Sequence, residues 1–144
     1  MKQEIKTATT AEEILKCLGA MKALRPQLTD NNITGKISAM IKNGYYLVYI
    51  EEGNEAAAAC GYRFTEHLAW GKVIYIDDLT THPDHRKKGY AKLLLDYVYD
   101  AALKTGCDQV HLDSGCNPQR YDAHRLYLKY GFNITSHHFA IEVK

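Results

Sequence analysis

Features that would place a protein in a specialised class are missing from this 144-residue chain. No apolar run approaches the roughly 20 residues that a membrane-spanning helix needs. Residues 1–6 lack the apolar core of a signal peptide. Lys and Arg number 18 against 17 Asp and Glu, so no strong field of one sign recruits nucleic acid or a membrane. These absences predict a cytoplasmic protein without nucleic-acid or membrane partners.

Cysteine and zinc patterns are also sparse. The four cysteines form no C-x-x-C pair, which favours buried free thiols over a disulfide framework. Two histidine pairs, His82-x-x-His85 and His137-His138, have no further Cys, Asp or Glu at the spacing of a zinc site. We therefore expect no bound metal. The length favours one domain over residues 1–144.

The hydrophobic patterns that are present predict a mixed α/β domain around one twisted sheet. Thr10 to Glu13 is a capping box that opens a helix, and Pro26 ends it. Ala56 to Ala59 would suit a helix or a strand, and the hairpin context favours a strand. The other expected elements are a strand at 3–8, a helix at 29–42, a hairpin at 45–50 and 55–64, a strand at 72–81, a helix at 89–104, a strand at 109–113, a helix at 122–130 and one or two strands within 132–143.

The segment Arg86-Lys87-Lys88-Gly89-Tyr90-Ala91 lies between an expected strand and the long helix. The first amides of a helix lack internal partners, and the helix dipole makes that end positive. Gly89 allows close backbone approach, and three basic residues add charge, so the segment suits a phosphate group. From spacing alone, a solvated basic turn is an equal alternative. Neither a P-loop nor a dinucleotide fingerprint is present.

Two motifs carry a resemblance to a known family. Arg86-x-x-Gly89-x-Ala91 resembles the acyl-CoA signature of the GNAT N-acetyltransferase superfamily. Residues 123–132, AHRLYLKYGF, are similar to that family's A-x-x-L-Y-x-x-x-G-F helix. The segments Leu24-Arg25-Pro26, 77–80 and 112–115 look like those of a small stand-alone subset. The resemblance covers nearly the whole chain.

The resemblance implies a GNAT-like fold: a mixed, mostly antiparallel sheet with splayed central parallel strands, flanked by about four helices. It implies that acetyl-CoA is the co-substrate and that an acetyl group moves to a primary amine by direct attack. Backbone amides of the segment from Arg86 to Ala91, which includes Lys87, Lys88, Gly89 and Tyr90, would hold the pyrophosphate. Backbone groups of Leu79, Thr80 and Thr81 would pair with the pantetheine arm, helped by a bulge in the strand.

Catalysis needs an acid for the departing CoA thiolate and a neutral amine. By its place in the motif, Tyr127 would contact the cofactor and act as the general acid. Asp77 and Asp78 are the candidate bases, directly or through water, and Asp78 is favoured, although either could equally cap a turn or pair with a lysine. Adjacent strand residues face opposite sides, so only one of the two can point into the cleft unless a bulge intervenes.

The acceptor side is less defined. Arg25, Asp77 and His138 are candidate contacts for a small-molecule or peptide amine. Many family members have an Asn seven residues before the motif tyrosine, where this chain has Arg120, and whether Arg120 or Asn117 replaces it stays open. A homodimer through the last strands also stays open. The rival functions are a non-catalytic acyl-CoA sensor on the same fold and a nucleic-acid-binding domain using residues 85–88, which the near-neutral charge disfavours.

Overall fold

A computed structural model describes residues 3–144, which fall into two compact units, residues up to His111 and residues 112–144. The first unit contains most of the sheet and four of the helices. The second contains the last helix and the C-terminal segment. That residues 1–144 form one domain stays a prediction.

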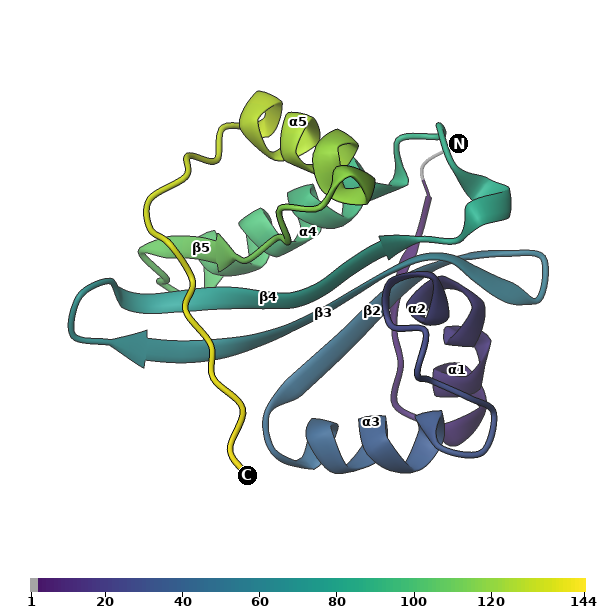
Figure 1. The fold of residues 1–144 in the computed structure, drawn as a ribbon. Coiled ribbons are helices and arrows are strands. Elements are labelled where there is room, and N and C mark those ends of the chain that lie inside the picture. The colour runs from purple at the N-terminus through teal and green to yellow at the C-terminus, as the bar shows by residue number, and fades with distance from the viewer. Residues whose placement is uncertain (1–2) are drawn as a thin grey trace. The chain divides into compact units, whose positions relative to one another are not determined.

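The sheet has five strands in the order β1-β2-β3-β4-β5. The first four strands pair antiparallel, each with its neighbour in sequence. Figure 1 shows the neighbouring strands β4 and β5 running in the same direction, with the long helix α4 (Tyr90–Lys104) between them in the sequence. The sheet is therefore mixed, as predicted. The strands are β1 Ile5–Thr7, β2 Tyr45–Glu52, β3 Glu55–His67, β4 Gly71–Thr81 and β5 Gln109–Leu112.

The first predicted helix is two helices in the structure. The capping box is confirmed, since the Thr10 side chain accepts from Glu13 N and Glu13 accepts from Thr10 N. The helix is interrupted at Cys17, whose N–H bonds to the carbonyl of Ile14, three residues back, at 3.0 Å. Such a tightened turn ends one helix before the next begins. The two helices are α1 Ala11–Lys16 and α2 Leu18–Leu24.

The remaining helices follow the predicted order. α3 begins four residues later than expected, because the Asn32 side chain accepts from Thr29 N at 2.8 Å and holds these residues in a turn. Gly106 and Gly131, with φ of +75° and +123°, follow the last two helices as expected. The bounds are α3 Ile33–Lys42, α4 Tyr90–Lys104 and α5 Tyr121–Tyr130, with 3₁₀ turns at Pro83–His85 and Pro118–Arg120.

Alternation along the strands divides the core of the first unit into two layers. Tyr45, Leu47 and Tyr49 of β2 belong to one buried cluster with residues of α1, α2 and α3. The even-numbered Val48 and Ile50 are also fully buried and face the other side of the sheet. Helix α4 packs against β2, β3 and β4, and Figure 1 shows it across the sheet from α1 to α3. Helices therefore cover both faces of the strands that carry the candidate site.

The prediction of strands within residues 132–143 was wrong, because that segment has no regular structure. Its apolar residues alternate, as in a strand with one buried face. However, the side chains of Phe139, Ile141 and Val143 are more than 90% exposed, so they gain nothing from burial. Within residues 3–144, no helix is both long and apolar enough to cross a membrane.

Candidate functional site

A buried carboxylate lies in the second half of β4. Asp78 is 8% exposed, and each of its oxygens accepts one hydrogen bond. Arg25, just after α2, donates from Nε to Oδ1 at 2.9 Å, and the Tyr45 hydroxyl at the start of β2 donates to Oδ2 at 2.7 Å. We call Asp78, Arg25 and Tyr45 the Asp78 centre. The candidate base is thus a charge that is both paired and hydrogen-bonded, as a buried carboxylate requires.

A glycine makes room for the Asp78 centre. Gly61 of β3 lies directly opposite Asp78 in the strand pairing. A Cβ added at Gly61 would overlap the Tyr45 hydroxyl. The missing side chain therefore lets the tyrosine reach across the sheet to the carboxylate. Burial, together with the nearby Asp78 charge, raises the pKa of Tyr45, so its hydroxyl remains a donor across the physiological range.

A β-bulge brings Asp77 and Asp78 to the same face of the sheet. Gly61 pairs with Asp78 and Tyr62 with Ile76, which leaves Asp77 as the extra residue on β4. The Asp77 carboxylate accepts from Arg63 Nε at 2.9 Å, and its backbone carbonyl accepts from Arg25 at 3.0 Å. Two of the three candidate acceptor contacts, Arg25 and Asp77, therefore lie together. The third, His138, belongs to the second unit.

The segment expected to hold the pyrophosphate has a bent backbone. Lys87 has φ of +65° and Gly89 has φ of +78°, immediately before the first residue of α4. A left-handed conformation costs about 1–2 kcal/mol for a residue with a side chain, so Lys87 stores strain, a feature that concentrates at ligand sites. A Cβ at Gly89 would meet nothing within 4 Å. We call residues 86–91 the phosphate cradle.

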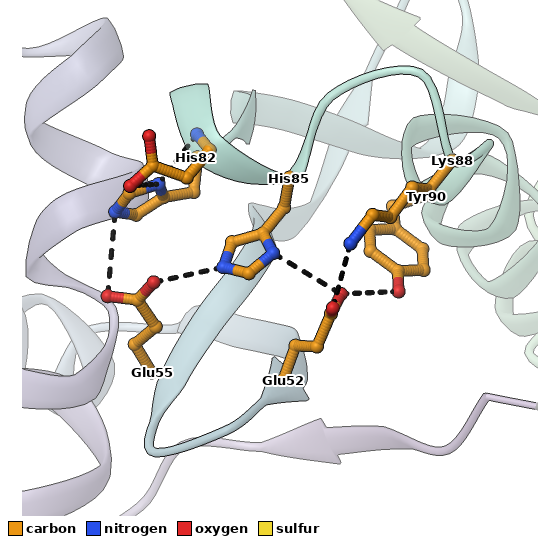
Figure 2. A network of polar contacts seen from close by, with 7 residues as sticks. Glu52, Glu55, His82, His85, Lys88 and Tyr90 are labelled. Carbon is orange, nitrogen blue, oxygen red and sulfur yellow. Dashed lines mark hydrogen bonds and ion pairs between the residues drawn. The ribbon is translucent and has the colours of Figure 1, made fainter.

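The cradle is exposed up to Gly89 and anchored at its far end. Tyr90 is 6% exposed, and its hydroxyl donates to Glu52 at 2.7 Å. Lys88 donates to the other oxygen of the same carboxylate at 2.7 Å (Figure 2). The hydrogen bonds from Lys88 and Tyr90 lower the pKa of Glu52, and the bond to Glu52 raises that of Tyr90. Glu52 thus ties the cradle to the turn between β2 and β3.

The strand segment Leu79–Thr81 leads from the Asp78 centre toward the cradle. Its residues pair with Cys60, Ala59 and Ala58 of β3. The Thr80 hydroxyl donates to the carbonyl of Ala20 in α2 at 2.8 Å, so the side chain points toward the helix. The backbone of Thr80 remains part of the strand and pairs with Ala59. The residues predicted to pair with the pantetheine arm therefore belong to a largely buried strand end.

Tyr127 lies on α5, in the second unit. It is 7% exposed, and its ring makes an edge contact with the ring of Phe132, with centroids 5.9 Å apart. The motif residues therefore contact each other: the helix ends at Gly131 and returns Phe132 against Tyr127, with Phe132 N bonding to Tyr127 O at 3.0 Å.

The loop before α5 has its own polar contacts. His124 Nε2 lies 2.7 Å from the carbonyl of Gly115 and 3.0 Å from Ser114 Oγ. Asn117 donates to Gln119 at 2.7 Å, and Arg120 is the residue that precedes the helix. His138 Nδ1 lies 3.5 Å from Asp113 Oδ2, and both side chains are at least half exposed.

Sequence reasoning missed three residues of these sites. Gly61 interrupts a strand pattern, and that signal alone could have indicated a bulge or a close approach. Glu52 and Glu55 flank the turn between β2 and β3, more than 25 residues from their partners, and no local pattern connects them to the cradle or to His82 and His85.

Comparison with known proteins identifies the fold and the activity. The model of the acetyltransferase (GNAT) family matches residues 9–132. The chain belongs to this family. A curated relative, the uncharacterized N-acetyltransferase YhdJ of Bacillus subtilis (strain 168), is 37% identical over 137 residues, which is 94% of this chain and 95% of the relative. This GNAT protein is thus an acetyl-CoA-dependent N-acetyltransferase.

Solved structures confirm the GNAT fold. A GNAT family acetyltransferase of Staphylococcus aureus subsp. aureus USA300_TCH1516 has a TM-score of 0.81 at 17% identity, covering 99% of this chain and all of that chain. The aminoglycoside N-acetyltransferase AAC(6')-Iy in complex with CoA has a TM-score of 0.79 at 14% identity, covering 100% and 97%. At these identities the likeness shows the architecture alone.

Proposed function

We propose that this GNAT acetyltransferase transfers the acetyl group of acetyl-CoA to a primary amine of a small-molecule or peptide acceptor. The observation that carries the proposal is the backbone of the phosphate cradle. Successive left-handed turns at Lys87 and Gly89 precede the amides that open α4, and such concave backbone segments bind anions. A Cβ at Gly89 would meet no atom within 4 Å, so nothing described crowds the backbone at this position.

Acetyl-CoA supplies an activated thioester carbonyl. The residues of this chain have three tasks: to hold the diphosphate in the cradle, to align the pantetheine arm along Leu79–Thr81, and to protonate the departing thiolate. Tyr127 is proposed for the last task, since an ordinary phenol stays protonated at neutral pH and can donate.

Asp78 is proposed as the general base for the acceptor amine. Both of its oxygens accept hydrogen bonds in the described structure. It would therefore take a proton through a water molecule, or directly once the Arg25 guanidinium moves to the acceptor. Arg25 is suited to this movement because its side chain is 44% exposed, against 10% for Asp78. Arg25, Asp77 and His138 are proposed as acceptor contacts.

The acceptor class follows from the charges at the Asp78 centre. Asp77 and Asp78 present two carboxylates on one face, and each is paired with a partly exposed arginine, Arg63 at 32% and Arg25 at 44%. A cationic amine can replace an arginine in such a pair. AAC(6')-Iy is named for aminoglycosides, which are polyamines, and a polyamine or a basic peptide end fits the same charge pattern here.

Binding of acetyl-CoA tests the cradle. In Gly89→Ala, the new side chain disfavours the positive φ by about 1–2 kcal/mol. If residue 89 of the variant relaxes to a negative φ, acetyl-CoA binding must restore the positive φ. We therefore expect the Kd for acetyl-CoA to rise about 5–30-fold in calorimetry. Gly35→Ala is the matched control, because Gly35 lies exposed in α3 with nothing near its Cβ position. Equal affinity in the two variants would remove the cradle from the proposal.

Turnover separates the enzyme from a non-catalytic sensor. A panel of polyamines, aminoglycosides and basic peptides is assayed with acetyl-CoA for release of free CoA thiol. Tyr127→Phe is expected to retain acetyl-CoA binding and to lower kcat by about 10²–10⁴-fold, the usual contribution of a general acid. An unchanged kcat across pH would exclude Tyr127 as the acid, and tight binding without turnover of any amine would favour the sensor.

A further inference from the structure

We propose that His82, His85 and Glu55 form a binding site for a divalent transition metal of the zinc type. The two histidines come from the segment that follows β4, and Glu55 is the first residue of β3. Their potential ligand atoms all lie within 4.8 Å of one another. Figure 2 shows the two imidazoles converging on the two oxygens of the Glu55 carboxylate. No part of the acetyl-transfer reaction uses these side chains.

The distances fit a single bound ion. His85 Nε2 lies 2.9 Å from one oxygen of Glu55, and His82 Nε2 lies 3.5 Å from the other. Ligands about 2.0–2.2 Å from a tetrahedral zinc ion lie roughly 3.3–3.6 Å apart, so small shifts bring the three groups to bonding distance. Two histidines and one carboxylate, with the fourth position left to water, form a recurrent zinc set.

The chemistry of the ligands selects the class of metal. Imidazole nitrogens favour zinc, copper, nickel and iron, whereas magnesium and calcium prefer a full set of oxygens. The ligand residues are only partly exposed, and the His82 and His85 side chains are about 15% accessible. The ion would therefore bind in a semi-enclosed position at the surface of the first unit, which leaves one side open for a water ligand.

Outer carboxylates complete the arrangement around both histidines. His85 Nδ1 is buried and makes no hydrogen bond of good geometry, although Glu52 Oε2 lies 3.3 Å from it. With the metal on Nε2, the proton on Nδ1 gains Glu52 as its acceptor, which is the usual carboxylate–histidine–metal relation. His82 Nδ1 accepts from Asp84 N at 3.1 Å, which leaves the ring proton of a neutral imidazole on Nε2. A metal on Nε2 would move that proton to Nδ1, where it would give up the bond from Asp84 N and face the Asp84 carboxylate, 3.9 Å away.

The backbone around the cluster holds the ligands in place. His82 N donates to the carbonyl of Ala57, the extra residue of a second bulge, at 2.8 Å. A Cβ on Gly19 of α2 would lie 2.7 Å from the His82 ring, so the glycine is required for the imidazole to fit. This placement connects the hairpin turn, α2 and the segment before the phosphate cradle. A bound ion would join the hairpin turn to the segment before the phosphate cradle, with the His82 ring held close to α2.

Metal binding to the tag-free protein tests the site. The background Cys116→Ser/His137→Gln/His138→Gln removes the exposed cysteine and histidine side chains of residues 3–144, and this protein is expected to bind one Zn²⁺ in calorimetry. Added Co²⁺ should give the visible absorption of a tetrahedral site. Glu55→Gln and His85→Gln should each weaken binding by more than the roughly 10–100-fold expected for the outer residue in Glu52→Gln.

Two further measurements keep the result decisive. Zn²⁺ should raise the Tm of the background protein and leave the Tm of folded Glu55→Gln unchanged. If Glu55→Gln fails to fold, bound Co²⁺ in the background protein should shift the NMR signals of the His82 and His85 rings and leave those of His67 in place. Absence of one-to-one binding, or equal affinity in Glu55→Gln, would overturn the proposal, as would an octahedral Co²⁺ spectrum.

Discussion

Two carboxylates, Asp78 and Glu52, each organise a set of polar contacts, and the two sets differ in burial. Asp78 is buried in the sheet, and its partners Arg25 and Tyr45 come from elements 53 and 33 residues away. Glu52 is more than a third exposed at the edge of a turn and holds Lys88 and Tyr90 of the cradle. Burial makes the geometry of the first group costly to change, whereas water can replace a partner in the second. The first group suits fixed chemistry, and the second suits a loop that responds to ligands.

The largest expected effect is at Gly61. In Gly61→Ala the new Cβ displaces the Tyr45 hydroxyl and leaves a buried oxygen of Asp78 without its donor. Overpacking and the unpaired oxygen each cost about 1–3 kcal/mol. The free energy of unfolding, measured with urea, should fall by their sum. Gly35→Ala, in an exposed helical position, should instead gain about 0.5–1 kcal/mol. A Gly61→Ala protein as stable as wild type would show that the centre is loosely packed.

A matched pair of tyrosine variants compares the two groups directly. Tyr45→Phe removes the donor to buried Asp78 and should lower the free energy of unfolding by about 1–3 kcal/mol. Tyr90→Phe removes the donor to exposed Glu52, where water takes its place, and should cost less than about 1 kcal/mol. Both are measured by urea unfolding at neutral pH. The comparison fails if Tyr90→Phe is the more damaging change.

The smallest expected effect concerns Glu13, whose partners are donors at the start of its own helix. Hydrogen bonds from the backbone amides of Thr9 and Thr10 lower the pKa of Glu13 from 4.5 to about 2. Its stabilising contribution is therefore present above pH 4.5 and is lost as the pH falls toward 2. Because water screens this surface group, the change should stay below about 1 kcal/mol.

Glu13→Gln keeps an acceptor at the capping position but does not titrate. Urea unfolding between pH 5 and pH 2 should therefore show a flatter acid limb in this variant than in wild type. Glu12→Gln, in the same turn, is the control for removing one negative charge. Parallel acid limbs in wild type and Glu13→Gln would contradict the assignment.

The sharp turn before α4 could be predicted from the sequence because its parts are adjacent. One glycine, a run of basic residues and the start of a helix together favour an anion site within six positions, and that role stays a prediction. The capping box, the hairpin and α4 were predictable for the same reason, since each depends on spacing within one element.

The Asp78 centre could be predicted only in part. Asp78 was a candidate because of its place on the strand, and its role stays a prediction, whereas the partners of its oxygens depend on pairings between distant segments. The bulge at Asp77 has no clear local signal, and the break at Cys17 interrupts a continuous apolar pattern. The exposed alternation at Phe139, Ile141 and Val143 suggested strands because periodicity alone does not say whether a partner is available.

The bulge in β4 acts as a change of phase along the strand. Before it, the odd-numbered Val73 and Tyr75 lie on the face that pairs with Arg63; after it, the even-numbered Asp78 and Thr80 take that face. If the same residues formed a regular strand with no bulge, Asp77 would lie opposite Gly61 and every later side chain of β4 would change face. Leu79 would turn toward α2, and Asp78 and Thr80 would turn away from Arg25 and Ala20. The bulge at Asp77 thus sets which side chains of β4 face the proposed acceptor site.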